Sequence, residues 1–215
     1  MSSAQRIYLV VYNLVSFIGW SAILVRAAAA LATGTPLGGL YAVVGDDLRR
    51  VQTLALFEIV HAVLGVVKSP FFTTATQVAS RLMIVWVNLY YVTDASVQTS
   101  PAFASLILAW GVTELIRYSL YGLAQVDVKP YWLTWLRYSS FLPLYPIGVA
   151  SECTLIYMST AAAEAVSPLL KYLFLTIIVV VYPPGLFMLY SFMLRQRRKV
   201  LGGGGSGAAK KVKSQ

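Results

Sequence analysis

Six long apolar stretches follow one another along the chain, separated by short segments that are polar or rich in Gly and Pro. Each stretch is about 20 residues long or longer, the length that a helix needs to cross the hydrocarbon core of a bilayer. The pattern therefore predicts an all-α integral membrane protein, a bundle of six transmembrane helices with both termini on the same side. The expected spans cover residues 7–31, 48–67, 74–93, 102–123, 131–159 and 169–194.

The first apolar stretch lies close to the N-terminus, so a cleaved signal peptide is the alternative to a spanning helix. The stretch is longer than the 7–15-residue apolar core of such a peptide, and it contains Asn13, Trp20 and Arg26. We therefore interpret it as the first span. Residues 32–47, which contain several Gly residues and a Pro, are expected to form a loop of turns.

Lys and Arg residues beside the spans predict the orientation, because short cytosolic loops carry an excess of them. With both termini in the cytosol, the inside residues are Arg6, Lys68, Lys129 and the basic run from Arg195 to Lys199. Four acidic residues then lie outside: Asp46, Asp47, Asp94 and Glu164. Arg49, Arg50 and Lys171 are exceptions to this bias.

The C-terminal segment, residues 200–215, is expected to be a flexible basic tail in the cytosol, because it begins with a Gly-rich linker. Lys211 and Lys213 have the spacing of a dilysine retrieval signal, which indicates the endoplasmic reticulum membrane. Much of the net charge of +9 lies in this tail and in the basic run before it. The charge therefore indicates a cytosolic membrane flank and not a nucleic-acid partner.

The overall composition agrees with a membrane protein, since 58% of the residues are hydrophobic and only 12% are charged. A single cysteine, Cys153, excludes an internal disulfide and a multi-cysteine metal site. Glu58 and His61, the only histidine, form one Glu-x-x-His motif, whereas a two-metal carboxylate bundle needs two of them. We expect no metal or other cofactor, and we expect His61 to make an interhelical hydrogen bond.

The stretch at 131–159 carries a carboxylate, Glu152, where lipid would disfavour a charge. Tyr131, Tyr138, Tyr145 and Glu152 follow at steps of seven, and a helix drifts by only ~20° per seven residues, so they form one polar stripe. Tyr145 and Glu152 are separated by about 10 Å along that face. This spacing admits a small reacting group between a phenol and a carboxyl group. In the alternative, Tyr145 is a packing aromatic and Glu152 pairs with an arginine.

Three arginines of the predicted spans are matched in number by three glutamates. The arginines are Arg81, Arg117 and Arg137, and the glutamates are Glu58, Glu114 and Glu152. Equal numbers suggest neutralising ion pairs within the bundle. A guanidinium group is also well suited to bind phosphate oxygens, so the arginines are alternatively candidate contacts for a phosphorylated ligand that enters from the cytosol.

Five segments together resemble a known family of membrane enzymes. They are YLVVYNLVSFIGW (8–20), FEIVHAVLGVVKSP (57–70), SRLMIVW (80–86), TELIRYSLYGL (113–123) and WLRYSSFLPLYPIGVASE (135–152). The chain resembles the very-long-chain 3-hydroxyacyl-CoA dehydratases, also called protein tyrosine phosphatase-like proteins, and the plant PASTICCINO type in particular. A cysteine phosphatase needs a Cys-x5-Arg loop, and Cys153 is followed by no such arginine.

The resemblance implies a six-helix protein of the endoplasmic reticulum that performs the third step of fatty acid elongation. Its substrate would be a 3-hydroxyacyl-CoA and its product a trans-2-enoyl-CoA. The implied partners are the elongase condensing enzyme, the 3-ketoacyl-CoA reductase, the enoyl-CoA reductase and the lipid bilayer. The catalytic tyrosine and glutamate of the family match Tyr145 and Glu152 by their position in the block.

Dehydration needs a base for the proton on C2 and an acid for the departing hydroxyl group, and it needs no redox cofactor. Tyr145 and Glu152 are the expected pair, and either of them can be the base. We expect substrate contacts from Arg81, Arg117, Arg137, Tyr118 and Ser151, and supporting roles for Glu114 and His61. A non-catalytic scaffold of the elongation enzymes and a small transporter are the alternatives from other functional classes.

Overall fold

A computed structural model describes residues 2–67, 69–92 and 94–202, and within them it is helical with no β-strand. The predicted all-α class is confirmed. The tail with Lys211 and Lys213 lies outside the described residues. The helices are α1 (Ser3–Ala32), η1 (Leu37–Gly39), α2 (Leu40–Thr53), α3 (Leu56–Val63), α4 (Phe71–Leu82), η2 (Met83–Tyr91), α5 (Ala95–Gln98), α6 (Pro101–Gln125), α7 (Tyr131–Arg137), α8 (Phe141–Met158), α9 (Thr160–Val166), α10 (Pro168–Thr176), η3 (Ile177–Val181) and α11 (Tyr182–Leu201).

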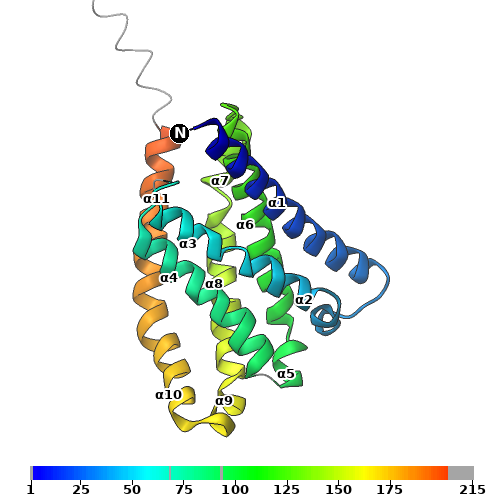
Figure 1. Ribbon diagram of the computed structural model, residues 1–215. Helices are drawn as coiled ribbons and strands as arrows, with labels where there is room; N and C mark the ends of the chain where they lie inside the picture. Colours follow the sequence, from blue (N-terminus) through cyan, green and yellow to red (C-terminus); the bar gives the residue numbers. More distant parts are fainter. Residues whose placement is uncertain (1, 68, 93, 203–215) are drawn as a thin grey trace, which may run out of the picture.

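Within the described residues, four helical segments are long and apolar enough to cross a membrane: α1, α6, the α7–α8 run Tyr131–Met158 and the run Pro168–Leu201 from α10 to α11. They coincide with four of the six predicted spans. The other two predicted spans form shorter pieces, α2 with α3 and α4 with the π-helix η2, which lie across the front of the bundle in Figure 1. The count of six spans stays a prediction.

The prediction of a loop over residues 32–47 is only partly correct, because the helix α2 already begins at Leu40. Leu40, Val44 and Leu48 recur every four residues, and each is at most 2% exposed. Apolar side chains at that spacing share one helical face, so their burial outweighs the low helix propensity of Gly45. The hydroxyl group of Tyr41 donates a hydrogen bond to the Leu89 carbonyl oxygen at 2.8 Å and so ties α2 to η2.

The polar stripe predicted from Tyr131 to Glu152 does not lie on one continuous helix, because residues 138–140 form a turn between α7 and α8. Pro143 explains the break. Its ring would collide with the carbonyl group of Ser139, four residues earlier, in an unbroken helix. Tyr145 and Glu152 lie together on α8, whereas Tyr131 lies on α7 and is 71% exposed.

The core lies between α1 and α6, where Trp20 and Ile23 pack with Phe103, Leu106 and Trp110. Helices in a bilayer associate mainly through close packing, which small residues allow. Gly111 of α6 is such a residue, since a Cβ atom there would lie 2.7 Å from Cδ2 of Leu24.

Gly111→Ala is therefore expected to be less stable than a matched glycine-to-alanine variant of the same helix by about 1 kcal/mol, the low end of the usual cost of overpacking, because the end of the Leu24 side chain must shift. Gly122→Ala, on the same helix, is the matched control, because the Cβ atom would meet Asn13 at an ordinary 3.5 Å. Thermal unfolding in detergent micelles measures both. Equal stability of the two variants would contradict this close packing of α1 on α6.

Candidate active site

Glu152 is held from two sides by neutral hydrogen-bond donors. The indole Nε1 of Trp110 on α6 donates to Oε1 at 2.9 Å, and the hydroxyl group of Tyr182 on α11 donates to Oε2 at 2.7 Å. Within the described residues, Glu152 forms no ion pair, so the contacts do not support the alternative of an arginine partner. Three helices thus fix the position of one carboxyl group inside an apolar bundle.

Tyr145 lies two turns before Glu152 on the same helix. Its ring stacks on Tyr190 of α11, with centroids 6.2 Å apart and planes inclined by 24°. Within the described part of the chain, its hydroxyl group has no hydrogen-bond partner. Helix α11 therefore supplies one tyrosine beside Tyr145 and another beside Glu152, while the Tyr145 hydroxyl group remains available to a ligand.

Ser151, an expected substrate contact, lies in the interface between α6 and α8. Its Oγ donates to the carbonyl oxygen of Ile147 at 2.8 Å and shares a hydrogen bond of 2.7 Å with Oγ of Ser105. The Ser151 side chain is buried. These contacts give it a role in joining the two helices, and its role as a substrate contact stays a prediction.

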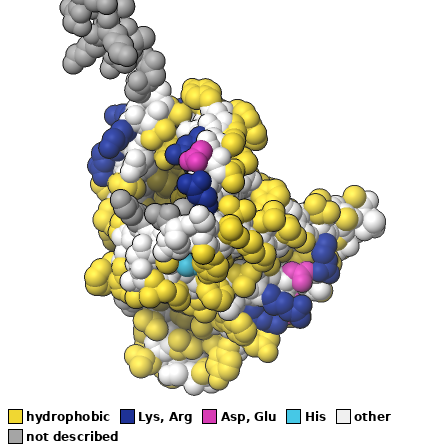
Figure 2. Space-filling model, turned by 45° about the horizontal axis from the view of Figure 1, so that its top comes forward, with side chains coloured by type: hydrophobic (Ala, Val, Ile, Leu, Met, Phe, Trp, Pro, Cys, Tyr) yellow, Lys and Arg dark blue, Asp and Glu magenta, His cyan; other side chains and the backbone are white. Residues whose placement is uncertain are grey.

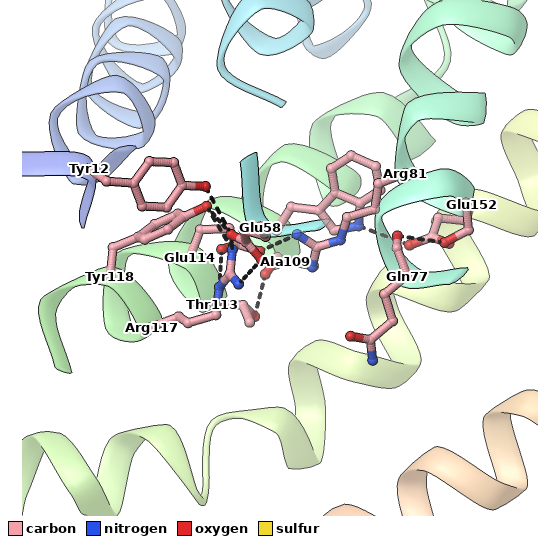
Figure 3. Close-up of polar contacts among 12 residues, drawn as sticks. Tyr12, Glu58, Gln77, Arg81, Ala109, Thr113, Glu114, Arg117, Tyr118 and Glu152 are labelled. Atoms are coloured by element: carbon pink, nitrogen blue, oxygen red, sulfur yellow. Dashed lines mark hydrogen bonds and ion pairs between the residues drawn. The ribbon is translucent and has the colours of Figure 1, made fainter. Parts of the chain in front are cut away.

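A second polar cluster, the ionic network, consists of Glu58, Arg81, Glu114 and Arg117 (Figure 3). Arg117 grips both oxygens of Glu58 at 2.7 Å and donates from Nε to Glu114 at 2.6 Å. Arg81 pairs with the other oxygen of Glu114, which is 2% exposed. Two guanidinium groups thus neutralise two carboxylates, and the predicted ion pairing is confirmed for these four residues.

Tyrosine hydroxyl groups complete the hydrogen bonding around this network. Tyr118 donates to Oε1 of Glu58 at 2.8 Å and accepts from Arg117 at 2.7 Å, and Tyr12 donates to the same Glu58 oxygen at 3.3 Å. His61 shares a 2.8 Å hydrogen bond with the Tyr8 hydroxyl group, so the expected interhelical bond is confirmed. The ionic network joins α3, α4 and α6, and the tyrosines Tyr8 and Tyr12 connect α1 to it.

The ionic network and Glu152 meet at Trp110. The guanidinium carbon of Arg81 lies 4.9 Å from the centre of the Trp110 ring, whose Nε1 holds Glu152. Figure 3 shows Arg81 between Glu114 and Glu152. Sequence reasoning missed Trp110, Tyr182 and Tyr190. In the structure, Tyr182 directly follows the π-helix η3, a type of helix frequent at functional sites.

Arg137 lies apart from these contacts, at the last residue of α7. Among the described residues it forms no ion pair, so its expected pairing is not confirmed. In that part of the chain, no group of three or more His, Cys, Asp or Glu side chains gathers where a metal ion could be held. The chemistry that the described site offers is hydrogen bonding and proton transfer by tyrosine and carboxyl groups.

Comparison with known proteins gives consistent matches. Residues 52–203 match the family model described as protein tyrosine phosphatase-like protein, PTPLA. The chain is 41% identical over 195 residues to a probable very-long-chain (3R)-3-hydroxyacyl-CoA dehydratase from Schizosaccharomyces pombe, covering 90% of this chain and 93% of the relative. A very-long-chain (3R)-3-hydroxyacyl-CoA dehydratase from Caenorhabditis elegans is 44% identical over 71% of this chain and 69% of the relative. PASTICCINO 2, the Arabidopsis thaliana dehydratase, is 39% identical over 74% of this chain and 71% of the relative. No solved structure matches.

Proposed function

This chain belongs to the protein tyrosine phosphatase-like (PTPLA) family, and from that membership we propose that it is a very-long-chain (3R)-3-hydroxyacyl-CoA dehydratase. It removes water from the 3-hydroxyacyl-CoA and releases the trans-2-enoyl-CoA, which is the dehydration step of fatty acid elongation. The single observation that carries the proposal is the match to the probable dehydratase from Schizosaccharomyces pombe, which covers nine tenths of this chain.

Glu152 and Tyr145 act as the acid–base pair of this reaction. The carboxylate of Glu152 takes the proton from C2, the electrons of that C–H bond form the C2–C3 double bond, and the C3–O bond breaks. Tyr145 donates its proton to the departing hydroxyl group, which leaves as water. The donors Trp110 and Tyr182 support this role because they hold the carboxyl group of Glu152 in a fixed position.

The protein lies in the endoplasmic reticulum membrane with both termini in the cytosol, and α2–α3 and α4–η2 complete six spans. The Ser3 end of α1 and the Leu201 end of α11 lie at the same end of the bundle, which supports termini on one side (Figure 1). The condensing enzyme and the two reductases of elongation are its partners there, because the substrate and product of the dehydration pass to and from them.

Formation of trans-2-enoyl-CoA tests the proposed activity. Membranes that contain this chain are expected to convert a long-chain (3R)-3-hydroxyacyl-CoA faster than matched membranes without it. Chromatography of the acyl-CoA products measures the difference. Equal rates in the two membranes, with the protein present at normal abundance, would overturn the enzyme assignment and favour a scaffold.

Tyr182→Phe tests the hydrogen bond that positions the base. Removing a hydrogen bond to a charged group costs about 1.5–3 kcal/mol, so kcat is expected to fall by roughly ten- to a hundredfold with little change in KM. Tyr172→Phe is the matched control, because that tyrosine on α10 is 65% exposed. A fall in kcat of the same size in both variants would contradict a specific role for Tyr182.

A further inference from the structure

A cavity of about 370 Å³ lies between α7 and the C-terminal end of α11. It is lined by Tyr131, Trp135, Arg197, Arg198, Leu201 and Gly202. A neighbouring apolar cavity of about 480 Å³ shares Tyr131 and Trp135 and adds Trp132 and Leu136. Figure 2, turned toward this end of the molecule, shows Lys and Arg side chains gathered beside a hollow. Volumes of this size suit a small-molecule ligand.

The lining residues combine two guanidinium groups with two aromatic faces. Arg197 and Arg198 form no ion pair within the described residues, which include every Asp and Glu of the chain. Arg197 is half-buried, and its Nε has one long contact, 3.4 Å to Oγ of Ser139. Guanidinium groups bind phosphate oxygens, and aromatic faces stack on nucleobases. The cavity thus offers both halves of a site for an adenine nucleotide.

One face of α11 connects this cavity to the candidate catalytic pair. Tyr182 contacts Glu152, Tyr190 contacts Tyr145 and Leu142, and Arg197 contacts Ser139. These α11 residues follow at steps of eight and seven, which keep them within one stripe about 100° wide along the helix. Helix α11 therefore runs antiparallel along α7 and α8, from the cavity to Glu152.

The lengths along this face match the shape of a CoA thioester. Arg197 lies about 10 Å from Tyr190 along the helix axis, at 1.5 Å per residue. The phosphopantetheine arm of CoA has about the length of four extended residues, ~14 Å. An arm that begins at phosphates beside Arg197 is therefore long enough to bring its thioester to Tyr190 and the stacked Tyr145.

We propose that this cavity binds the 3′-phospho-ADP part of the acyl-CoA substrate, with phosphates on Arg197 and Arg198 and the adenine against Tyr131 and Trp135. The inference rests on the proposed function, whose substrate it places. In this proposal the phosphate groups do not bind Arg81 and Arg117, because the guanidinium groups of these arginines are already paired with the carboxylates of Glu58 and Glu114. An anionic lipid headgroup offers the same phosphate chemistry, so the test separates the two sources.

Binding of CoA itself tests the site without requiring turnover. The protein is placed in nanodiscs of phosphatidylcholine alone, and the dissociation constant for CoA is measured for R197Q/R198Q and for R195Q/K199Q. Both double variants remove two positive charges from the last turns of α11, but Arg195 and Lys199 do not line the cavity. Loss of a single charge-assisted hydrogen bond weakens binding roughly ten- to a hundredfold, so CoA binding is expected to weaken at least about tenfold in the first variant only.

Trp135→Leu tests the aromatic half of the site, with Trp132→Leu as control because Trp132 lines only the neighbouring cavity. Loss of one stacked base is expected to weaken CoA binding about five- to a hundredfold. Binding of pantetheine, which lacks the nucleotide, is expected to stay unchanged in every variant. The two tryptophan variants also test the proposal independently of the arginine positions.

Several outcomes would overturn the proposal. Equal weakening in R197Q/R198Q and R195Q/K199Q would show a general charge effect. Unchanged CoA binding in R197Q/R198Q together with weaker attachment to phosphatidylserine vesicles would show a lipid-headgroup site. Selective loss of CoA binding in a chain that does not dehydrate 3-hydroxyacyl-CoA would support the cavity while overturning the proposed function. An active R197Q/R198Q variant with an unchanged KM would support the proposed function and overturn the proposed role of the cavity.

Discussion

Tyr145→Phe and Glu152→Gln are each expected to lower kcat for dehydration by at least about a hundredfold, because a positioned acid or base contributes 10²–10⁴-fold. Each substitution removes the proton-transferring atom and keeps the size of the side chain. The stack of residue 145 on Tyr190 and the hydrogen bond from Trp110 to residue 152 can both persist. Turnover of a long-chain (3R)-3-hydroxyacyl-CoA is measured in membranes with matched protein levels.

A substrate analogue distinguishes the two roles. An analogue with a leaving group at C3 that departs without protonation no longer needs the acid, but it still needs the base. Tyr145→Phe is expected to regain elimination with this analogue, and Glu152→Gln is not. The opposite pattern would make Tyr145 the base, and wild-type turnover of the hydroxyacyl substrate in both variants would give the pair a structural role. Tyr172→Phe is the control for tyrosine substitution as such.

Arg117→Leu is expected to destabilise the protein by about 3–5 kcal/mol. It leaves Glu114 paired with Arg81, while the carboxylate of Glu58 loses its arginine partner. Breaking a buried ion pair at one partner leaves an uncompensated charge, which accounts for a loss of this size. Arg6→Gln is the control, since its pair with Asp127 has side chains that are 50% and 81% exposed. Such exposed pairs contribute at most about 1 kcal/mol.

The free energy of unfolding in detergent micelles measures this difference. Adding Glu58→Gln to Arg117→Leu is expected to restore part of the stability, because Glu114 then keeps Arg81 as its partner and no charge is left over. A loss in Arg117→Leu no larger than in Arg6→Gln would contradict the view that the network stabilises the bundle. No recovery in the double variant would show that the loss is one of packing alone.

Local patterns in the sequence were sufficient for the helical class and for four of the membrane-length helices. An apolar run long enough to cross a bilayer must be helical when it stands alone, because its backbone groups find hydrogen-bond partners only within the run. The same local periodicity placed Tyr145 and Glu152 on one face of α8. It did not place the breaks in the expected spans at 48–67 and 131–159, where packing of α2 and the ring of Pro143 decide the outcome.

Pairing between helices was decided only in the tertiary structure. The charges of Glu58, Glu114 and their arginines indicated that ion pairs exist, but not that Arg117 would bridge two glutamates. Nor did any local signal reveal that Trp110 and Tyr182 hold Glu152. The periodicity of a helix depends on its own residues, whereas the side chains that meet across helices depend on the rotation and crossing of each helix. Those are set by the packing of the whole bundle.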